Sequence, residues 1–166
     1  MTTKIDVTSI LKEHVDSLRD AGTKNISRLD VAVMFGIPLA LGVLALVVGF
    51  HVKDDHIGTL VSAFSIFAGF LFNVIVLIYG FDPPSKTDVT ADDQMILLSQ
   101  TFANISYAVI VSIAVVLVLL FMLFIGSGVQ VLVSSIFVVL ATNFGLSLLM
   151  VLKRIYVLLG LKFRGE

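Results

Sequence analysis

Long apolar runs dominate the chain. Four of them, at about 31–50, 57–81, 94–125 and 129–152, each contain enough residues to cross about 30 Å of hydrocarbon as a helix. Short polar segments, "HVKDDH" and "IGSGV", connect the runs within each pair, and the longer "DPPSKTDVTADD" joins the two pairs. The pattern predicts an all-α protein whose residues 29–152 form a four-transmembrane-helix bundle made of two hairpins.

The third apolar run is too long for the membrane. About thirty helical residues at 1.5 Å each reach roughly 45 Å, so its first turns are expected to project from the membrane or to lie at its surface. Pro83 and Pro84 are predicted to stop the preceding helix, and Asp92 and Asp93 stand where helix-start residues are expected.

Neutral polar and small residues recur inside the runs at spacings of three or four, which places them on one face of each helix. They are either seams where helices pack closely and hydrogen-bond, or the lining of a water-filled passage or subunit seal. Both interpretations require Asn73 to face protein rather than lipid. The candidate pore-lining or inter-helix polar residues are Ser62, Ser65, Asn73, Asn104, Ser112 and Asn143.

A pore would have to be shared between copies of the chain, because a single four-helix bundle closes on its own side chains. We therefore expect a homo-oligomer, with a tetramer as the simplest form, arranged around a symmetry axis. In such a pore Phe70, Phe72 or Phe121 would form a hydrophobic constriction.

Residues 1–28 are predicted to form an amphipathic cap helix that ends near Ala21 and Gly22. Its apolar stripe, Val7, Leu11, Val15 and Leu18, is expected to pack against other copies or the central loop. Lys12 and Arg19 share one flank, where symmetry would concentrate positive charge and bind a polyanion. The alternative is a solvated helix with an ion pair such as Lys12 to Asp16.

The distribution of cations predicts the orientation. Of the 11 Lys and Arg residues, only Lys53 lies outside the amino-terminal segment, the central loop and the basic tail 153–166. Because cytoplasmic loops hold Lys and Arg in excess, we expect both termini in the cytoplasm of a bacterial cell and a multi-pass protein in its inner membrane. The overall charge of -1 adds no further attraction to anionic partners.

Residue content argues against several kinds of chemistry. Only 14% of residues are charged and none lies centrally in a predicted span, which disfavours proton relays and voltage sensing. The chain has no cysteine, and no nucleophile and base are spaced for catalysis, so neither an enzyme nor a cofactor is expected. "HVKDDH" contains metal-ligand residue types, but a short polar turn of this kind does not by itself predict a metal site.

Two segments, "ISRLDVAVMFGIPLALG" and "LVSAFSIFAGFLFNVIVLIYG", resemble small four-span membrane proteins of bacterial anti-phage loci, such as the Hailong effector or the Kiwa membrane subunit. The resemblance covers residues 26–81. It implies an inner-membrane homo-oligomer that responds to infection. In the Hailong type, a single-stranded DNA oligomer made by a partner enzyme holds the effector shut, and here Lys12 and Arg19 would contact it.

The expected function is therefore a gated ion channel or pore, acting in anti-phage defence and gated by the amino-terminal helices. Bending of the first span at Gly36 and Pro38 would couple the cap to the passage. The alternative is a non-conducting membrane sensor or scaffold whose central loop binds a cytoplasmic partner encoded nearby.

Overall fold

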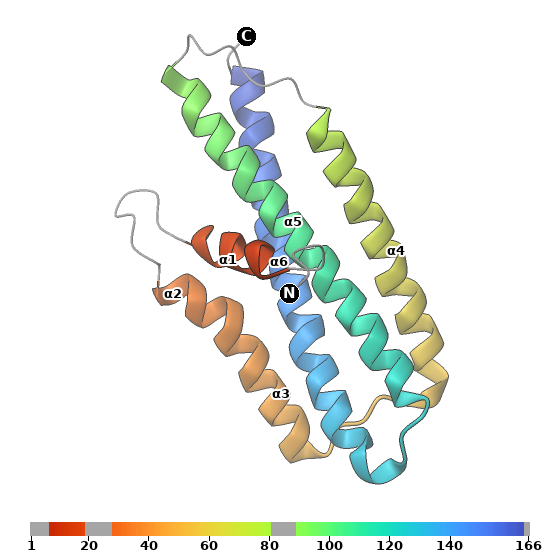
Figure 1. The fold of residues 1–166 in the computed structure, drawn as a ribbon. Coiled ribbons are helices and arrows are strands. Elements are labelled where there is room, and N and C mark those ends of the chain that lie inside the picture. The colour runs from red at the N-terminus through yellow and green to blue at the C-terminus, as the bar shows by residue number, and fades with distance from the viewer. Residues whose placement is uncertain (1–6, 19–27, 81–88, 165–166) are drawn as a thin grey trace.

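A computed structural model describes residues 7–18, 28–80 and 89–164, and this part of the chain contains helices and no strand (Figure 1). A short helix precedes one rod formed by an α-helical turn, a π-helical segment and an α-helix, and three longer helices follow. The elements are α1 (Thr8–Asp16), α2 (Arg28–Val31), η2 (Ala32–Gly36), α3 (Ile37–Val48), α4 (Asp54–Tyr79), α5 (Val89–Met122) and α6 (Ser127–Arg164).

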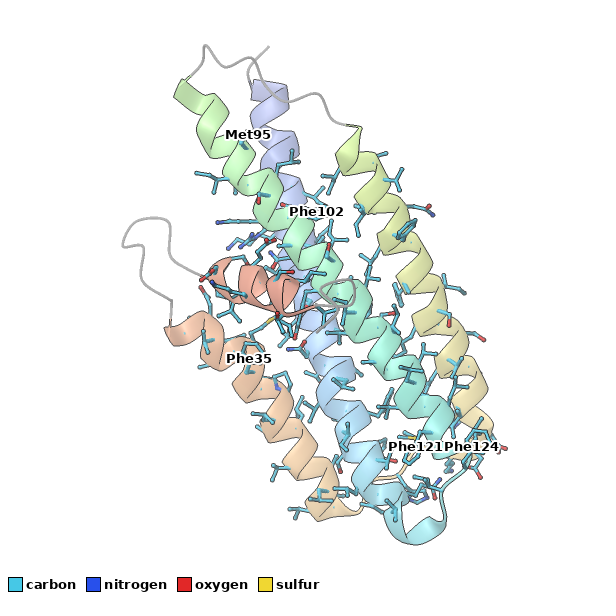
Figure 2. All side chains as sticks on the ribbon, viewed as in Figure 1. Phe35, Met95, Phe102, Phe121 and Phe124 are labelled. Carbon is cyan, nitrogen blue, oxygen red and sulfur yellow. The ribbon has the colours of Figure 1, made fainter. Side chains whose placement is uncertain are left out.

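Within the described residues, four helical segments are long and apolar enough to cross a membrane. They are Leu29–Val48, Asp54–Ile78, Met95–Met122 and Gly128–Val157. The prediction of an all-α protein with four helices long and apolar enough to span a membrane is thus confirmed, with boundaries shifted by a few residues. Large apolar side chains cover the outside of these helices, as lipid contact requires; Phe121 and Phe124 lie at the end of α5 remote from α1 (Figure 2).

The spanning helices lie in a row, in the order α4, α5, α6 and α3. The backbone of α5 approaches both α4 and α6, and α3 approaches α6, whereas α3 and α4 make no close backbone approach within the described residues (Figure 1). Phe64 of α4 also reaches Phe137 and Phe144 of α6, with ring centroids 6.2 and 5.3 Å apart. The two end helices, α3 and α4, consequently keep much of their surface outside the protomer.

A glycine sets the close approach of α3 to α6. A Cβ atom added to Gly42 would meet the side chain of Val139 and would lie 3.3 Å from the carbonyl oxygen of Ser135. Small residues allow helix backbones to approach in this way inside membranes, where packing rather than the hydrophobic effect drives association. Gly42 therefore fixes α3 against α6.

The turn between α3 and α4 is attached to α6 by hydrogen bonds. Gly49 ends α3 with a positive φ of 72°, a conformation that glycine adopts without steric cost. The backbone N–H of Val52 donates to Ser134 Oγ at 3.0 Å, and Gln130 Nε2 donates to Asp54 Oδ1 at 3.2 Å. The first bond satisfies a backbone N–H, and together they hold the first hairpin in place.

Candidate functional site

A network of buried polar side chains connects α1 to the spanning helices. We call it the docking network and define it as His14, Ser17, Asn104, Tyr107, Asn143 and Arg154. Helix α1 lies across α5 at the level where α2 begins, while α5 and α6 continue beyond it (Figure 1). From Asn104 to Met122 α5 advances about 27 Å, close to the thickness of the hydrocarbon layer, which places the network near one edge of that layer.

Asn104 of α5 is the centre of the network and is fully buried. Its Oδ1 accepts from His14 Nδ1 at 2.7 Å and from Ser17 Oγ at 2.8 Å. The Ser17 hydroxyl also lies 2.6 Å from the His14 carbonyl oxygen within α1. With the amide oriented this way, Nδ1 is the protonated nitrogen of a neutral His14 ring.

An aromatic stack continues the network toward α6. The rings of His14 and Tyr107 lie 3.7 Å apart and within 8° of parallel. The Tyr107 hydroxyl donates to Asn143 Oδ1 at 2.8 Å, and Asn143 Nδ2 donates to the carbonyl oxygen of Met34 at 3.0 Å. Contacts of α1 are therefore linked, through three side chains, to the backbone of η2.

The hydrogen bond from Asn143 to the Met34 carbonyl oxygen is explained by the sequence. Pro38 has no N–H, so it cannot bond to the carbonyl four residues earlier, which is that of Met34. A membrane helix that contains proline needs a neighbour to satisfy the carbonyl that is left over. Asn143 supplies that donor, and the π-helical segment Ala32–Gly36 lies immediately before the proline.

Arg154 of α6 completes the docking of α1. Its Nη2 donates to the carbonyl oxygen of Ser17 at 2.6 Å, just after the last turn of α1, where helix carbonyls have no partner in the helix itself. Three buried nitrogens have no hydrogen-bond partner among the described residues: His14 Nε2, Asn104 Nδ2 and Arg154 Nη1. The network is thus incompletely satisfied.

Burial lowers the pKa of His14 below its ordinary value of 6.5, because a charged ring there would lose its hydration. The hydrogen bond to Asn104 acts in the opposite direction, and the nearby charge of Arg154 lowers the pKa further. His14 is consequently mainly neutral at pH 7, with its proton on Nδ1, which donates to Asn104.

The predicted polar residues fall into two groups in the structure. Asn104, Ser112 and Asn143 are buried between helices; Ser112 Oγ donates to the Phe64 carbonyl oxygen of α4 at 2.9 Å. Ser62, Ser65 and Asn73 are exposed on α4. The first group links helices within one chain, and among the described residues the second group has no helix of the same chain in front of it.

We call the exposed face of α4 that contains Ser62, Ser65, Gly69 and Asn73 the α4 stripe. Asn73 follows the buried Leu71 by two residues, a rotation of about 200° around the helix, so the stripe points away from the protomer. The Ser62 hydroxyl bonds to the Gly58 carbonyl oxygen at 2.9 Å. The amide of Asn73 has no partner within the described part of the chain.

The predicted packing of the apolar stripe of α1 against other copies or the central loop stays a prediction, since residues 81–88 lie outside the described part of the chain. Within the protomer, Val7 and Leu11 are 41% and 43% exposed, whereas Leu18 of the same stripe is 4% exposed. His14 and Ser17 are also buried, and apolar periodicity did not indicate this because their polar partner Asn104 lies on α5. Lys12 is exposed on α1, and Arg19 lies outside the described residues.

His14, Tyr107 and Arg154 were not among the predicted site residues. Asn104 and Tyr107 share one face of a helix, and that spacing was the available indication that the aromatic rings of His14 and Tyr107 contribute to the site. No periodicity in the chain connects His14 with a residue 90 positions later, or Ser17 with one 137 positions later.

Comparison of the chain with protein-family models, curated proteins and solved structures gives no match. The geometry alone defines the class: an all-helical, multi-pass membrane protein with a polar network near one edge of its spanning region.

Proposed function

We propose that this chain forms a homo-oligomeric membrane pore in which copies meet along the α4 stripe and α1 acts as the gate. The pore belongs to the bacterial inner membrane, with both termini in the cytoplasm, and opens in response to phage infection. The pore and its gate are inferred from the arrangement of the helices. The role in infection is inferred from the resemblance of residues 26–81 to membrane proteins of anti-phage loci.

The position of Asn73 carries the proposal. Its amide is exposed on a helix that is apolar enough to span a membrane, and it has no hydrogen-bond partner in the described chain. Leaving an amide unpaired in hydrocarbon costs about 2–7 kcal/mol. A second copy of the chain, or water in a passage between copies, removes that cost, whereas lipid does not.

Helix α1 has the properties of a gate. It contains 9 residues, too few for a stable isolated helix in water, so its structure depends on docking. Docking uses the buried Leu18 and a small number of polar bonds, and the stack of His14 on Tyr107 leads through Asn143 to η2 at the start of the first span. Release of α1 would therefore remove support from the segment before Pro38.

A polyanionic regulator, such as a single-stranded DNA oligomer, fits this scheme through the exposed Lys12 on α1. Its binding would hold α1 in the docked position or pull it away. Arg19, the second expected contact, lies outside the described residues.

The test is ion flux from liposomes that contain the purified full chain. His14→Ala removes the stacked ring and one bond to Asn104, and we expect flux to rise by an order of magnitude or more, because buried polar contacts of this kind contribute about 1–3 kcal/mol. Lys12→Ala changes the exposed side of the same helix and, with no polyanion in the assay, should leave flux at the wild-type level.

Equal, negligible flux from wild type and His14→Ala, with insertion verified, would contradict the pore and favour a non-conducting sensor or scaffold. Equal flux increases from His14→Ala and Lys12→Ala would retain the pore and reject the docking network as its gate.

A further inference from the structure

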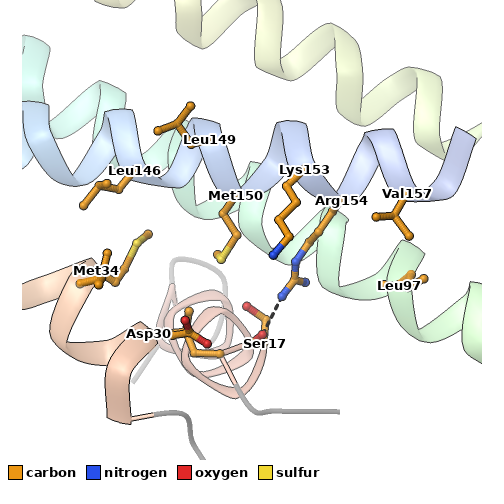
Figure 3. Close-up of a pocket in the computed structure, with 12 residues that line it drawn as sticks. Ser17, Asp30, Met34, Leu97, Leu146, Leu149, Met150, Lys153, Arg154 and Val157 are labelled. Carbon is orange, nitrogen blue, oxygen red and sulfur yellow. Dashed lines mark hydrogen bonds between the residues drawn. The ribbon is translucent and has the colours of Figure 1, made fainter. Parts of the chain in front are cut away.

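A cavity of about 500 Å³ lies beside the docking network, between α1, the α2–η2 segment, α5 and α6 (Figure 3). Its volume is within the range of small-molecule sites. Apolar side chains form most of the wall, including Val33, Leu146 and Leu149, while Lys153 and Arg154 provide two cations. Asp30 is the one carboxylate among the lining residues, so the lining carries one net positive charge.

The two cations point the same way. In Figure 3 the ammonium of Lys153 and the guanidinium of Arg154 both extend from α6 toward the end of α1 and the start of α2. Arg154 uses Nη2 for the Ser17 carbonyl, but its buried Nη1 has no partner in the described part of the chain. A buried guanidinium nitrogen without an acceptor is costly, and an anionic oxygen is its best partner.

The depth of the cations matches that of lipid headgroups. Arg154 follows Gly128, the start of the fourth span, by about 39 Å along the helix, beyond the roughly 30 Å of hydrocarbon. Leu149 and Leu146 lie about 7.5 and 12 Å closer to the membrane centre on the same helix, where acyl chains run. The cations therefore lie at the depth of a phospholipid headgroup, and the apolar wall lies at the depth of its acyl chains.

We propose that this cavity binds an anionic phospholipid from the leaflet on the side of α1. The phosphate contacts Lys153 and Arg154 Nη1, and an acyl chain lies along Leu146, Leu149 and Val33. Basic pockets between spanning helices at the membrane surface bind anionic headgroups in this way. A solvated phosphate compound would use the cations but would leave the apolar wall without a partner. The inference does not depend on conduction.

The test is native mass spectrometry of the delipidated full chain in detergent, titrated with phosphatidylglycerol and with phosphatidylcholine of the same acyl chains. We expect phosphatidylglycerol to bind on the order of tenfold more tightly. Lys153→Gln should weaken phosphatidylglycerol binding roughly fivefold, since each cation near a headgroup contributes about that factor. Lys53→Gln, at an exposed lysine outside the cavity, should have no effect.

Leu149→Ala should weaken both lipids, because it shortens the apolar wall without changing charge. Lys153→Gln is the sharper probe of the headgroup, since a change at Arg154 would also remove the bond to Ser17. Identical phosphatidylglycerol binding by Lys153→Gln and Lys53→Gln would overturn the proposal. Displacement of the lipid by inorganic phosphate or a short DNA oligomer at equal concentration would also overturn it, in favour of a soluble phosphate ligand.

Discussion

At the scale of single residues, His14 is the most sensitive point of the structure. The neutral ring donates once, through Nδ1, and its Nε2 is buried without a partner in the described chain. A proton on Nε2 would place a charge and an unpaired donor between Tyr107 and Arg154. The docked position of α1 consequently disfavours the charged ring.

The first prediction is that docking of α1 weakens in acid. Burial lowers the pKa of docked His14 below 6.5, so as the pH falls below about 6.5 the undocked state takes up the proton first. The docking equilibrium should then shift toward release by up to tenfold per pH unit, until the lowered pKa is passed. At pH 7 and above, docking should be independent of pH with respect to this group.

The chain contains no cysteine, so labels placed by Lys12→Cys and Lys153→Cys would report the distance between α1 and α6 by electron spin resonance. His14→Gln should abolish the pH dependence. His51→Gln and His56→Gln, at the far end of the spans, should preserve it. A pH profile that survives in His14→Gln would assign the effect to another group.

At the scale of elements, the π-helical segment and the proline that follows it form a unit with Asn143. The second prediction concerns this unit. Asn143→Ala leaves the Met34 carbonyl and the Tyr107 hydroxyl without partners and should lower the free energy of unfolding by about 2 kcal/mol. Pro38→Ala returns an N–H to the helix, so it should offset part of that loss.

A double-mutant cycle measured by thermal unfolding in detergent tests this coupling, with an expected interaction of about 1 kcal/mol. The same cycle with Ser112→Ala in place of Asn143→Ala should be additive, because Ser112 bonds to α4 and not to Met34. Strict additivity in both cycles would mean that Asn143 does not satisfy the carbonyl left by Pro38.

The third prediction concerns the contact of α3 with α6. Gly42→Ala places a methyl group against Val139 and should destabilise the protein by about 1–3 kcal/mol. Gly36→Ala is the matched control on the same rod, because an added Cβ there meets nothing within 4 Å. Thermal unfolding of the two variants tests this prediction. Equal stability of Gly42→Ala and Gly36→Ala would show that α6 moves away from α3 at little cost in free energy.

The number and approximate limits of the spans could be predicted from the sequence, because hydrocarbon thickness fixes the length of an apolar helix. Asn104 and Asn143 could be identified as residues that need partners for the same reason. Their actual partners could not, since His14 and Met34 are close to them only after folding. The burial of His14 and Ser17 could not be predicted either, because apolar periodicity does not identify polar residues that are buried against other polar residues.

At the scale of the whole molecule, the row of helices leaves α4 at one end. Its buried side faces α5 and α6, and the α4 stripe lies on the opposite side, where the described residues offer no neighbour. Gly69 lies in the stripe, and an added Cβ there would meet nothing within 4 Å. The stripe therefore has both the small residue that lets a helix approach and the amide that needs a partner.

The fourth prediction is that Asn73→Leu reduces self-association without unfolding the protomer. Leucine fills a similar volume but donates no hydrogen bond, and interhelical bonds of this kind contribute about 0.6–2 kcal/mol per copy. Repeated around an axis, that loss should shift the wild-type oligomer toward monomer by at least tenfold, as measured by mass photometry in detergent.

Phe72→Leu, at a residue that is 59% exposed and about 100° away on the same helix, is the matched control. An oligomer that withstands Asn73→Leu but dissociates with Phe72→Leu would move the subunit contact from the α4 stripe to its flank, and Asn73 would then have to face water.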